Sequence, residues 1–417
     1  MRYIADLHIH SKYSRACSKD LDIAHLDEWG KIKGIQIMST ADFTHPFWLK
    51  ALKENLEPSA PGLYKRKGTS GAVHFILGTE LSCIYSQGGA VRRIHLCILL
   101  PDFAAVDKLI ATLERRGVNL RADGRPIMGL SAIELTKIAL DAHPAAMIIP
   151  AHAWTPWFSV FGSKSGFDSL AECFGEVTKE IFAIETGLSS DPAMNWRISA
   201  LDRITLVSNS DAHSLPNLGR EANAFEIPES ELTYTELRRI LKEKDKQRFL
   251  YTIEFFPEEG KYHVDGHRDC DVTMGPAETK KDHGICPKCK KPLTIGVLHR
   301  VDDLADRPNG YKLDSIPYKS IVPLQEIIAE TLEVGRQSKK VQQQYFDLIK
   351  KCADEFSLLL DVPEDELRRH ATPEVVTGIL NVRDNRVVAT AGYDGVYGTI
   401  SVFGVEGLPK PNQARLL

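Results

Sequence analysis

The sequence has no run of about 18 apolar residues, and its first residues do not combine a basic segment with an apolar stretch. We therefore expect neither a membrane span nor a secretion signal, and we expect a cytoplasmic protein. A strong excess of charge is also missing, because the formal net charge is −4 over 417 residues. The chain as a whole does not look like a nucleic-acid binder, although a local basic stripe would matter more than the sum.

Three common catalytic signatures are absent as well. We find no Gly-x-x-x-x-Gly-Lys loop, no Gly-x-Gly-x-x-Gly after a strand and no Gly-x-Ser-x-Gly turn. Cysteine is mostly scattered: five of the eight cysteines stand alone, as free thiols usually do, and only those from 270 to 289 form a group. What remains is a hydrophobic content of 43%, enough for a sizeable core, and a length that suggests two or three domains.

The opening stretch places three polar residues at the end of an apolar run. In a strand, the period of two puts Asp6, His8 and His10 on one face, which is how a strand end presents ligands to a metal. An isolated His-x-His is as easily a solvated pair. The rest of the chain has to decide.

Six further apolar runs carry the same residue types within them or just after them. The pairs of run and residue are 35–40 with Asp42 and His45, 72–77 with Glu80, 93–100 with His95, 146–150 with His152, 181–184 with Glu185, and 204–207 with Asp211 and His213. Seven short strands, most of them separated by helical or long connections, favour a parallel β/α arrangement. In such folds the site forms at the carboxyl ends of the strands.

Nine of these residues are candidate metal ligands: His8, His10, Asp42, His45, Glu80, His95, His152, Asp211 and His213. One divalent ion takes about four to six ligands, so this set suits two or three ions bridged by a carboxylate such as Glu80. Imidazole with carboxylate suits Zn²⁺, Mn²⁺, Fe²⁺ or Ni²⁺ and suits Mg²⁺ poorly when it is alone. Clustered ions activate water for attack at phosphorus, so we expect phosphoester hydrolysis, with Glu80, Asp211 and His213 in catalytic roles.

The middle of the chain has the spacing of a structural zinc site. Two pairs, each separated by two residues, stand fifteen residues apart: His267 with Cys270, and Cys286 with Cys289. This spacing predicts one closed tetrahedral Zn²⁺, and His263 or His283 could replace His267.

The C-terminal part is predicted to be mainly helical. Apolar residues recur at helical spacing over 323–351, 363–370 and 373–380, and a strand-like run over 399–403 follows. Between them, Tyr393 and Tyr397 stand among three glycines and could stack on a base. From residue 313 onward acidic residues outnumber basic ones, so this part is no electrostatic footprint by itself.

The motifs around the candidate ligands resemble the polymerase and histidinol phosphatase (PHP) superfamily. The resemblance rests on Asp6-Leu-His8-Ile-His10, Gly78-Thr-Glu80, His95, Ala151-His152 and Ser210-Asp-Ala-His213, and covers about the first 225 residues. It implies a distorted seven-stranded β/α barrel with a trinuclear metal site, in which Asp6 orients the ligand histidines. The family usually reads Asp-His where Asp42 is followed by Phe43, so either Asp42 or His45 could touch a metal.

The order of barrel, zinc module, helical segment and Gly-Tyr-Asp-Gly-x-Tyr-Gly is similar to endonuclease Q. Gly260–Arg268 and Ile285–Cys289 carry this likeness over nearly the whole chain. It implies cleavage of damaged DNA on the 5′ side of uracil, hypoxanthine, xanthine or an abasic site, with the lesion out of the stack. A monomer is favoured and a sliding-clamp partner is plausible. We expect substrate contacts from Glu185, Asp191, Asn195, Arg197, Tyr393 and Tyr397.

These predictions divide the chain into a catalytic barrel over 1–256, a zinc module over 257–316 and a helical DNA-binding domain over 317–417. One alternative is a phosphatase for a small phosphomonoester, although a barrel alone would suffice for that activity. A second is a DNA-binding module without catalysis, which would not need all nine ligands. An amidohydrolase would usually add a strand-end lysine between its metals, and no clear candidate is present.

Overall fold

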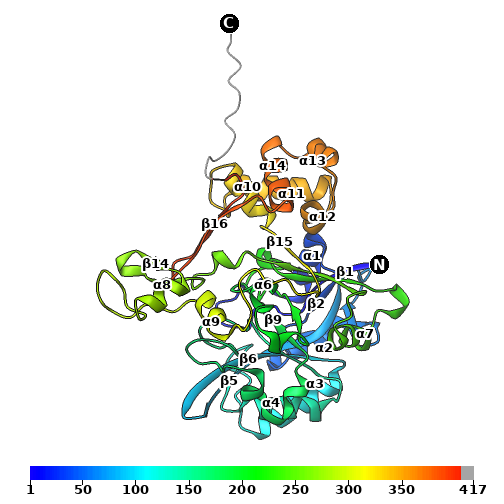
Figure 1. Cartoon of the computed structure of the whole chain (residues 1–417). Coiled ribbons are helices and arrows are strands. Elements are labelled where there is room, and N and C mark those ends of the chain that lie inside the picture. Colours follow the sequence, from blue (N-terminus) through cyan, green and yellow to red (C-terminus); the bar gives the residue numbers. More distant parts are fainter. Residues whose placement is uncertain (405–417) are drawn as a thin grey trace.

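The computed structural model describes residues 1–404, and its centre is a mixed sheet of eleven strands (Figure 1). The main path of the sheet runs β15-β12-β11-β1-β2-β5-β4-β3, while β6 pairs with β5 and β8, and β7 pairs with β5. The strands are β1 (Arg2–Asp6), β2 (Ile37–Ser39), β3 (Leu56–Ala60), β4 (Leu63–Arg66), β5 (His74–Gln87), β6 (Ala90–Leu100), β7 (Ile127–Met128), β8 (Met147–Pro150), β11 (Ala222–Glu226), β12 (Phe249–Glu254) and β15 (Tyr318–Ser320).

The seven predicted strands are present, but they do not all run parallel. Strand β1 pairs in parallel with β2, and β2 with β5, whereas β5–β6 and β6–β8 are antiparallel. The chain reverses between β5 and β6 through Gly88 and Gly89, whose φ angles of 61° and 76° suit glycine in a tight hairpin. Strands β9 (Ala183–Glu185) and β10 (Thr205–Val207) form a parallel pair of their own. Closure into a barrel therefore stays a prediction.

Helices surround this sheet, and their ends follow the local sequence. Helix α1 begins after Asp22, whose carboxylate accepts the N–H groups of Ala24 and His25, and it ends at Gly34 with φ of 80°. Helix α4 begins with a capping box between Ser131 and Glu134. The helices of this part are α1 (Ile23–Lys33), α2 (Pro46–Asn55), α3 (Phe103–Arg115), α4 (Ala132–Ala142), α5 (Leu170–Phe174), α6 (Pro192–Asn195) and α7 (Tyr234–Glu243).

The C-terminal helices pack together on the α1 side of the sheet (Figure 1). They are α10 (Leu324–Thr331), α11 (Lys339–Lys351), α12 (Glu355–Leu360), α13 (Glu364–His370) and α14 (Pro373–Arg383). The continuous helical spacing predicted over 323–351 is wrong at 332–338, where Glu333 has a φ of 51° and Ser338 caps a new helix. A buried ion pair of 2.6 Å between Lys33 and Glu355 joins α1 to this group.

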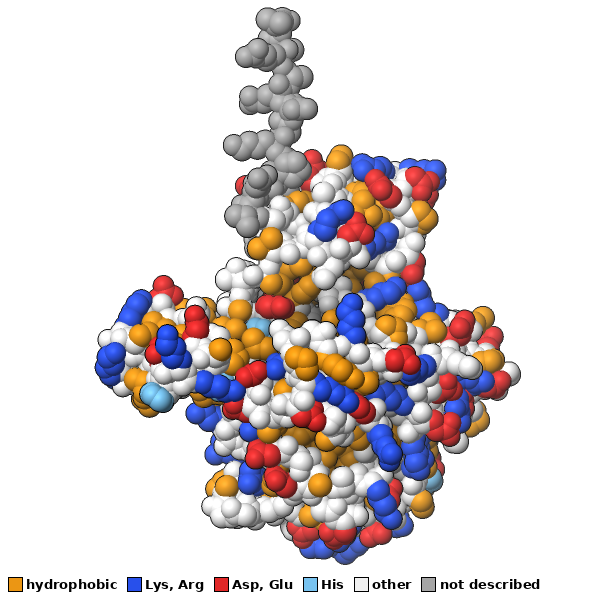
Figure 2. Space-filling view, viewed as in Figure 1, with side chains coloured by type: hydrophobic (Ala, Val, Ile, Leu, Met, Phe, Trp, Pro, Cys, Tyr) orange, Lys and Arg blue, Asp and Glu red, His pale blue; other side chains and the backbone are white. Residues whose placement is uncertain are grey.

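A lobe projects from the side of the molecule and is reached by the last strands of the chain (Figures 1 and 2). It contains β13 (Asp265–His267), β14 (Val272–Met274), α8 (Pro276–Lys281) and α9 (Val297–Leu304). Strands β16 (Val388–Thr390) and β17 (Thr399–Ser401) form an antiparallel ribbon from the C-terminal helices toward it. The rest of the predicted third domain, 405–417, lies outside the described residues. Within 1–404, no helix has the length and apolar character that a bilayer crossing requires.

Candidate functional site

Glu80, on β5, stands at the centre of the candidate site and is 1% exposed. Its Oε1 lies 2.6 Å from His95 Nδ1 and 3.1 Å from His152 Nε2. Its Oε2 accepts a hydrogen bond of 2.9 Å from Arg125 Nη1 and lies 3.3 Å from His10 Nε2. One carboxylate thus faces ligand candidates on both sides.

Two groups of potential metal ligands share this carboxylate. The first is His8, His10, Glu80 and Asp211, and the second is Glu80, His95 and His152; within each group the donor atoms lie within 4.8 Å of one another. The buried Nε2 of His8 has no hydrogen-bond partner within the protein. An orphaned imidazole nitrogen facing carboxylates is what a metal ligand needs, so the residues fit divalent ions.

Backbone geometry at the strand ends brings these ligands together. Asp211 and His152 have φ angles of 47° and 30°, a conformation that is costly for non-glycine residues and concentrates at functional sites. The Asp211 loop is held to the opening stretch because Asp211 N donates to His8 O at 2.9 Å and His10 N donates to Ala212 O at 3.1 Å.

Glu185 is buried against His8, with an exposure of 1%, and it is among the residues that line the neighbouring cavity. Both of its carboxylate oxygens are 3.0 Å from His8 Nδ1, and it also accepts hydrogen bonds from Asn209 Nδ2 and His152 N. Burial opposes a charged imidazole here, but Cys97 and Glu185 raise the pKa of His8 well above its usual value. Glu185 therefore orients His8, as carboxylates behind metal-binding histidines do.

Asp42 and His45 lie outside both ligand groups. Asp42 Oδ2 accepts hydrogen bonds from Ser11 N, Ser11 Oγ and Ser14 Oγ at 2.7–2.8 Å, while its Oδ1 is 3.4 Å from His10 Nδ1. The His45 ring stacks on Tyr13 with centroids 4.3 Å apart, and burial lowers its pKa. Asp42 therefore orients the His10 ring, whereas His45 packs against aromatic side chains.

Asp6 supports the Asp211 loop rather than the histidines that it was expected to orient. It accepts hydrogen bonds of 3.0 Å from Ser210 N and Gly219 N, and burial raises its pKa to about 6. His213 stands at the same loop, with its Nδ1 2.8 Å from Asp211 O and its ring 4.4 Å from that of His10. It belongs to neither ligand group.

A cavity of about 490 Å³ adjoins the ligand groups. Its wall includes His152 and Asp211 together with Arg125, Trp157, Phe158, Lys261, Tyr262 and Tyr397. Lys261 Nζ lies 5.7 Å from the ring centroids of both Tyr262 and Tyr397. Tyr397, at the end of the β16–β17 ribbon, is 71% exposed, so the cavity offers aromatic faces and cations beside the candidate metal centre.

The other predicted substrate residues have partners within the protein. Asp191 caps α6 by accepting Met194 N, Asn195 Oδ1 accepts Trp154 Nε1 at 2.8 Å, and Arg197 Nη2 donates to Asp302 at 2.7 Å. The Tyr393 hydroxyl donates to Asp271 Oδ1 at 2.7 Å. None of these four lines the cavity, and we assign them structural contacts.

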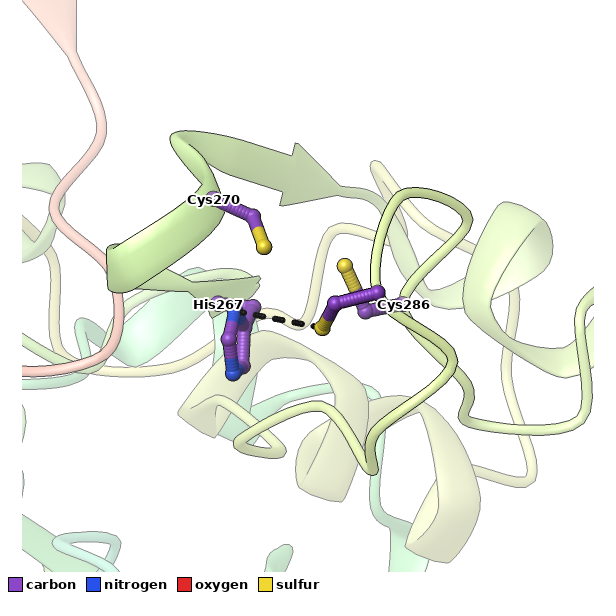
Figure 3. A group of neighbouring side chains, drawn as sticks. His267, Cys270 and Cys286 are labelled. Carbon is purple, nitrogen blue, oxygen red and sulfur yellow. Dashed lines mark hydrogen bonds between the residues drawn. The ribbon is translucent and has the colours of Figure 1, made fainter.

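The four predicted zinc ligands come together in the projecting lobe (Figure 3). The side chains of His267, Cys270 and Cys286 point toward a common space, and His267 Nδ1 is 3.8 Å from Cys289 Sγ. The donor atoms of all four lie within 4.8 Å of one another, and neither alternative histidine belongs to the group. The set fits a tetrahedral ion.

The chain is similar to one protein-family model and to two proteins of known sequence. A family model described as the MJ0043 C-terminal domain matches residues 323–386. The chain is 32% identical to the uncharacterized protein MJ0043 of Methanocaldococcus jannaschii over 60% of the chain, but spans only 31% of that protein. It is 28% identical to the uncharacterized protein YqxK of Bacillus subtilis, over 95% of the chain and 98% of that protein.

Two solved structures are similar over almost the whole chain. One is the lesion-specific endonuclease PfuEndoQ from Pyrococcus furiosus, with a TM-score of 0.84, 31% identity and coverage of 96% of this chain and 95% of that chain. The other is endonuclease Q in complex with a 27-mer duplex substrate that has an abasic lesion at the active site, with a TM-score of 0.83, 31% identity and 96% coverage of both chains.

Proposed function

The chain belongs to the endonuclease Q family, and from this premise we propose that it is a metal-dependent DNA repair endonuclease. It hydrolyses the phosphodiester on the 5′ side of a deaminated base (uracil, hypoxanthine or xanthine) or of an abasic site. The observation that carries the proposal is that Glu80 is shared by two ligand groups at the wall of an aromatic cavity.

The two ligand groups would hold two divalent ions bridged by Glu80. When bound, such ions activate a water molecule and stabilise charge at phosphorus. His8, His10 and Asp211 would hold one ion, with His95 and His152 on the other side of Glu80. Within the chain, Glu185 and Asp42 fix the rings of His8 and His10, so the donors are in place before any substrate arrives.

Arg125 would contact the scissile phosphate. Its Nη1 is anchored on Glu80, it is 25% exposed at the side chain, and it lines the cavity. A guanidinium has five N–H donors in a fixed fork, so the remaining donors can bind a phosphate oxygen. Charge that develops on that oxygen would then meet a preorganised cation.

The cavity would take the nucleotide that has left the stack. Trp157, Tyr262 and Tyr397 supply ring faces, and Lys261 lies against two of these rings. The aromatic faces would stack on an extruded deaminated base. A weakly paired base costs little to extrude and an abasic site has no base to unpair, which favours both kinds of lesion. The aromatic wall also favours this reading over a phosphatase for a small phosphomonoester, which would need no such surface.

A structural Zn²⁺ in the projecting lobe would keep the cavity wall ordered. The segment before the zinc ligands carries Lys261 and Tyr262, and the ribbon tip is tied to it because Gly395 N donates to Lys261 O at 2.9 Å. Metal binding by a small module is coupled to its folding. The zinc ion would therefore affect the substrate site through Lys261 and Tyr262. The domain boundaries at 256/257 and 316/317 stay a proposal.

One experiment tests the proposed activity. The metal-loaded protein is incubated with end-labelled duplexes that carry a single uracil, hypoxanthine or abasic site, beside an undamaged duplex and a generic phosphomonoester. We expect a nick on the 5′ side of the lesion only. Hydrolysis of the monoester alone would support the phosphatase, and DNA binding without either activity would support a non-catalytic module.

A further inference from the structure

Three aromatic rings cluster at the edge of the candidate metal centre, and none of them lines the cavity. The His45 ring stacks on Tyr13, with centroids 4.3 Å apart and 21° between ring planes, and the tilted Phe47 ring lies 5.8 Å from His45 and 6.4 Å from Tyr13. Tyr13 is partly buried and His45 is buried, but Phe47 is 57% exposed. One ring of the cluster is therefore open to solvent.

The backbone around the ring cluster is held by several contacts. Pro46 begins α2 at this point, and the buried Trp48 donates its indole N–H to Thr40 O and Ala41 O at 2.9 and 3.0 Å. On the other side, Tyr13 O accepts Gly124 N at 3.0 Å. A Cβ added to Gly124 would lie 2.4 Å from Asp42 Oδ2, so this close approach requires glycine. These contacts hold the backbone that carries the three rings.

Exposed cations flank the rings. The Arg121 guanidinium carbon lies 5.8 Å from the Phe47 ring centroid, and Lys12 Nζ lies 5.9 Å from that of Tyr13. Both residues are exposed, and within residues 1–404 neither forms an ion pair. Positive charge beside an open ring face is the combination that binds an unpaired base with its phosphate.

We propose that Phe47, backed by His45 and Tyr13, forms a second nucleotide site, which stacks an unpaired base of the DNA while Arg121 and Lys12 bind the adjacent backbone. The cavity holds the lesion, and this platform holds another nucleotide of the opened duplex. The platform lies near Asp42, which faces His10 Nδ1, whereas His10 Nε2 faces Asp211 at the cavity wall. The inference rests on the proposed function because both need DNA as the partner. His45, which was predicted as a metal ligand, would then support the Phe47 platform instead.

The test uses a fluorescently labelled single-stranded oligonucleotide that contains 2-aminopurine, titrated with the full-length metal-loaded protein. Stacking on Phe47 should quench the 2-aminopurine, and anisotropy gives the affinity. Phe47→Ala and Phe47→Leu should each weaken binding about tenfold and remove the quenching, since leucine keeps the bulk but loses the ring face. Phe47→Tyr should bind as the wild type does, and so should Val91→Ala, which changes an exposed apolar residue elsewhere.

A second variant probes the charge. Arg121→Gln should reduce the dependence of log affinity on log salt by about 0.7, the value for one phosphate contact on a single strand. Equal affinity and quenching in wild type and Phe47→Ala would overturn the platform, as would full binding by Phe47→Leu. Lesion nicking is measured in parallel. Absence of nicking by the wild type counts against the proposed function, whereas the Phe47 series decides the platform.

Discussion

Arg125 Nη1 donates a hydrogen bond of 2.9 Å to Glu80 Oε2, the carboxylate that both candidate ligand groups share. A guanidinium is thereby fixed between the candidate metal centre and the cavity. The Glu80 carboxylate raises the pKa of Arg125, and His95 and Arg125 together outweigh burial and hold the pKa of Glu80 well below its usual value. Both shifts favour the charged forms of the two groups.

The first prediction concerns Arg125. Arg125→Ala should lower the rate of lesion nicking about 10²- to 10³-fold, because the phosphate loses a preorganised donor. Bound metal, measured by inductively coupled plasma mass spectrometry, should stay at the wild-type level. Arg116→Ala, which removes an exposed arginine paired with Glu134 at 3.8 Å, serves as the control. A normal nicking rate in Arg125→Ala would remove this residue from the proposed mechanism.

The second prediction concerns the shared carboxylate. Glu80→Gln should abolish nicking and reduce the metal bound at the candidate metal centre, because an amide cannot bridge two cations as a carboxylate does. Asp211→Asn should do the same for the group that contains His8. The exposed Glu54→Gln should change neither quantity. Full metal content in Glu80→Gln would contradict its assignment as a ligand.

The third prediction concerns the lobe. Cys286→Ser should release one equivalent of zinc and lower the Tm, since the ion and the fold of a small module stabilise each other. The cavity wall at Lys261 and Tyr262 should loosen, so the KM for lesion DNA should rise. Cys17→Ser changes a cysteine that belongs to none of the groups of potential metal ligands within residues 1–404, and it should leave the zinc content unchanged. Unchanged zinc in Cys286→Ser would refute the site.

The fourth prediction concerns pH. Burial raises the pKa of Glu254 from 4.5 to about 8, and its Oε1 has no hydrogen-bond partner. The native carboxyl is therefore protonated at pH 7 while the unfolded chain would ionise it, so stability falls as pH rises from about 4.5 to 8. Glu254→Gln should flatten this decline, with a Tm above that of the wild type at pH 9. A parallel pH profile for the two proteins would contradict the shift.

The sequence predicted strands in runs that are mainly apolar, because a strand that is buried in the core needs apolar side chains. It missed β11 and β12, whose residues Asn223 and Thr252 are polar yet fully buried, Asn223 through bonds to Ala5 O and Ser208 O. Polar residues can be buried in such strands because groups far away in the sequence form hydrogen bonds with them. The break after α10 was missed for a related reason: apolar spacing continues across it although the backbone does not.

In the candidate site, too, local features could be predicted from the sequence and contacts between distant segments could not. Histidines and carboxylates at strand ends were visible in the sequence because their chemistry is local. Arg125 was not, since it stands in an irregular loop and meets Glu80 only through the packing of Gly124 on Asp42. Glu185 was found by its position after a strand, but its place behind His8 depends on the fold.

The β16–β17 ribbon supplies part of the cavity wall from a segment that is synthesised near the end of the chain. His8 and His10 leave the ribosome first, whereas Tyr397, which completes the wall of the same cavity, comes almost four hundred residues later. The candidate metal ligands are therefore all synthesised long before the ribbon that completes the cavity wall. Under the proposed function, chains that stop before the ribbon would have these ligands without the aromatic residue that completes the substrate cavity, so lesion discrimination would be the last property that the growing polypeptide acquires.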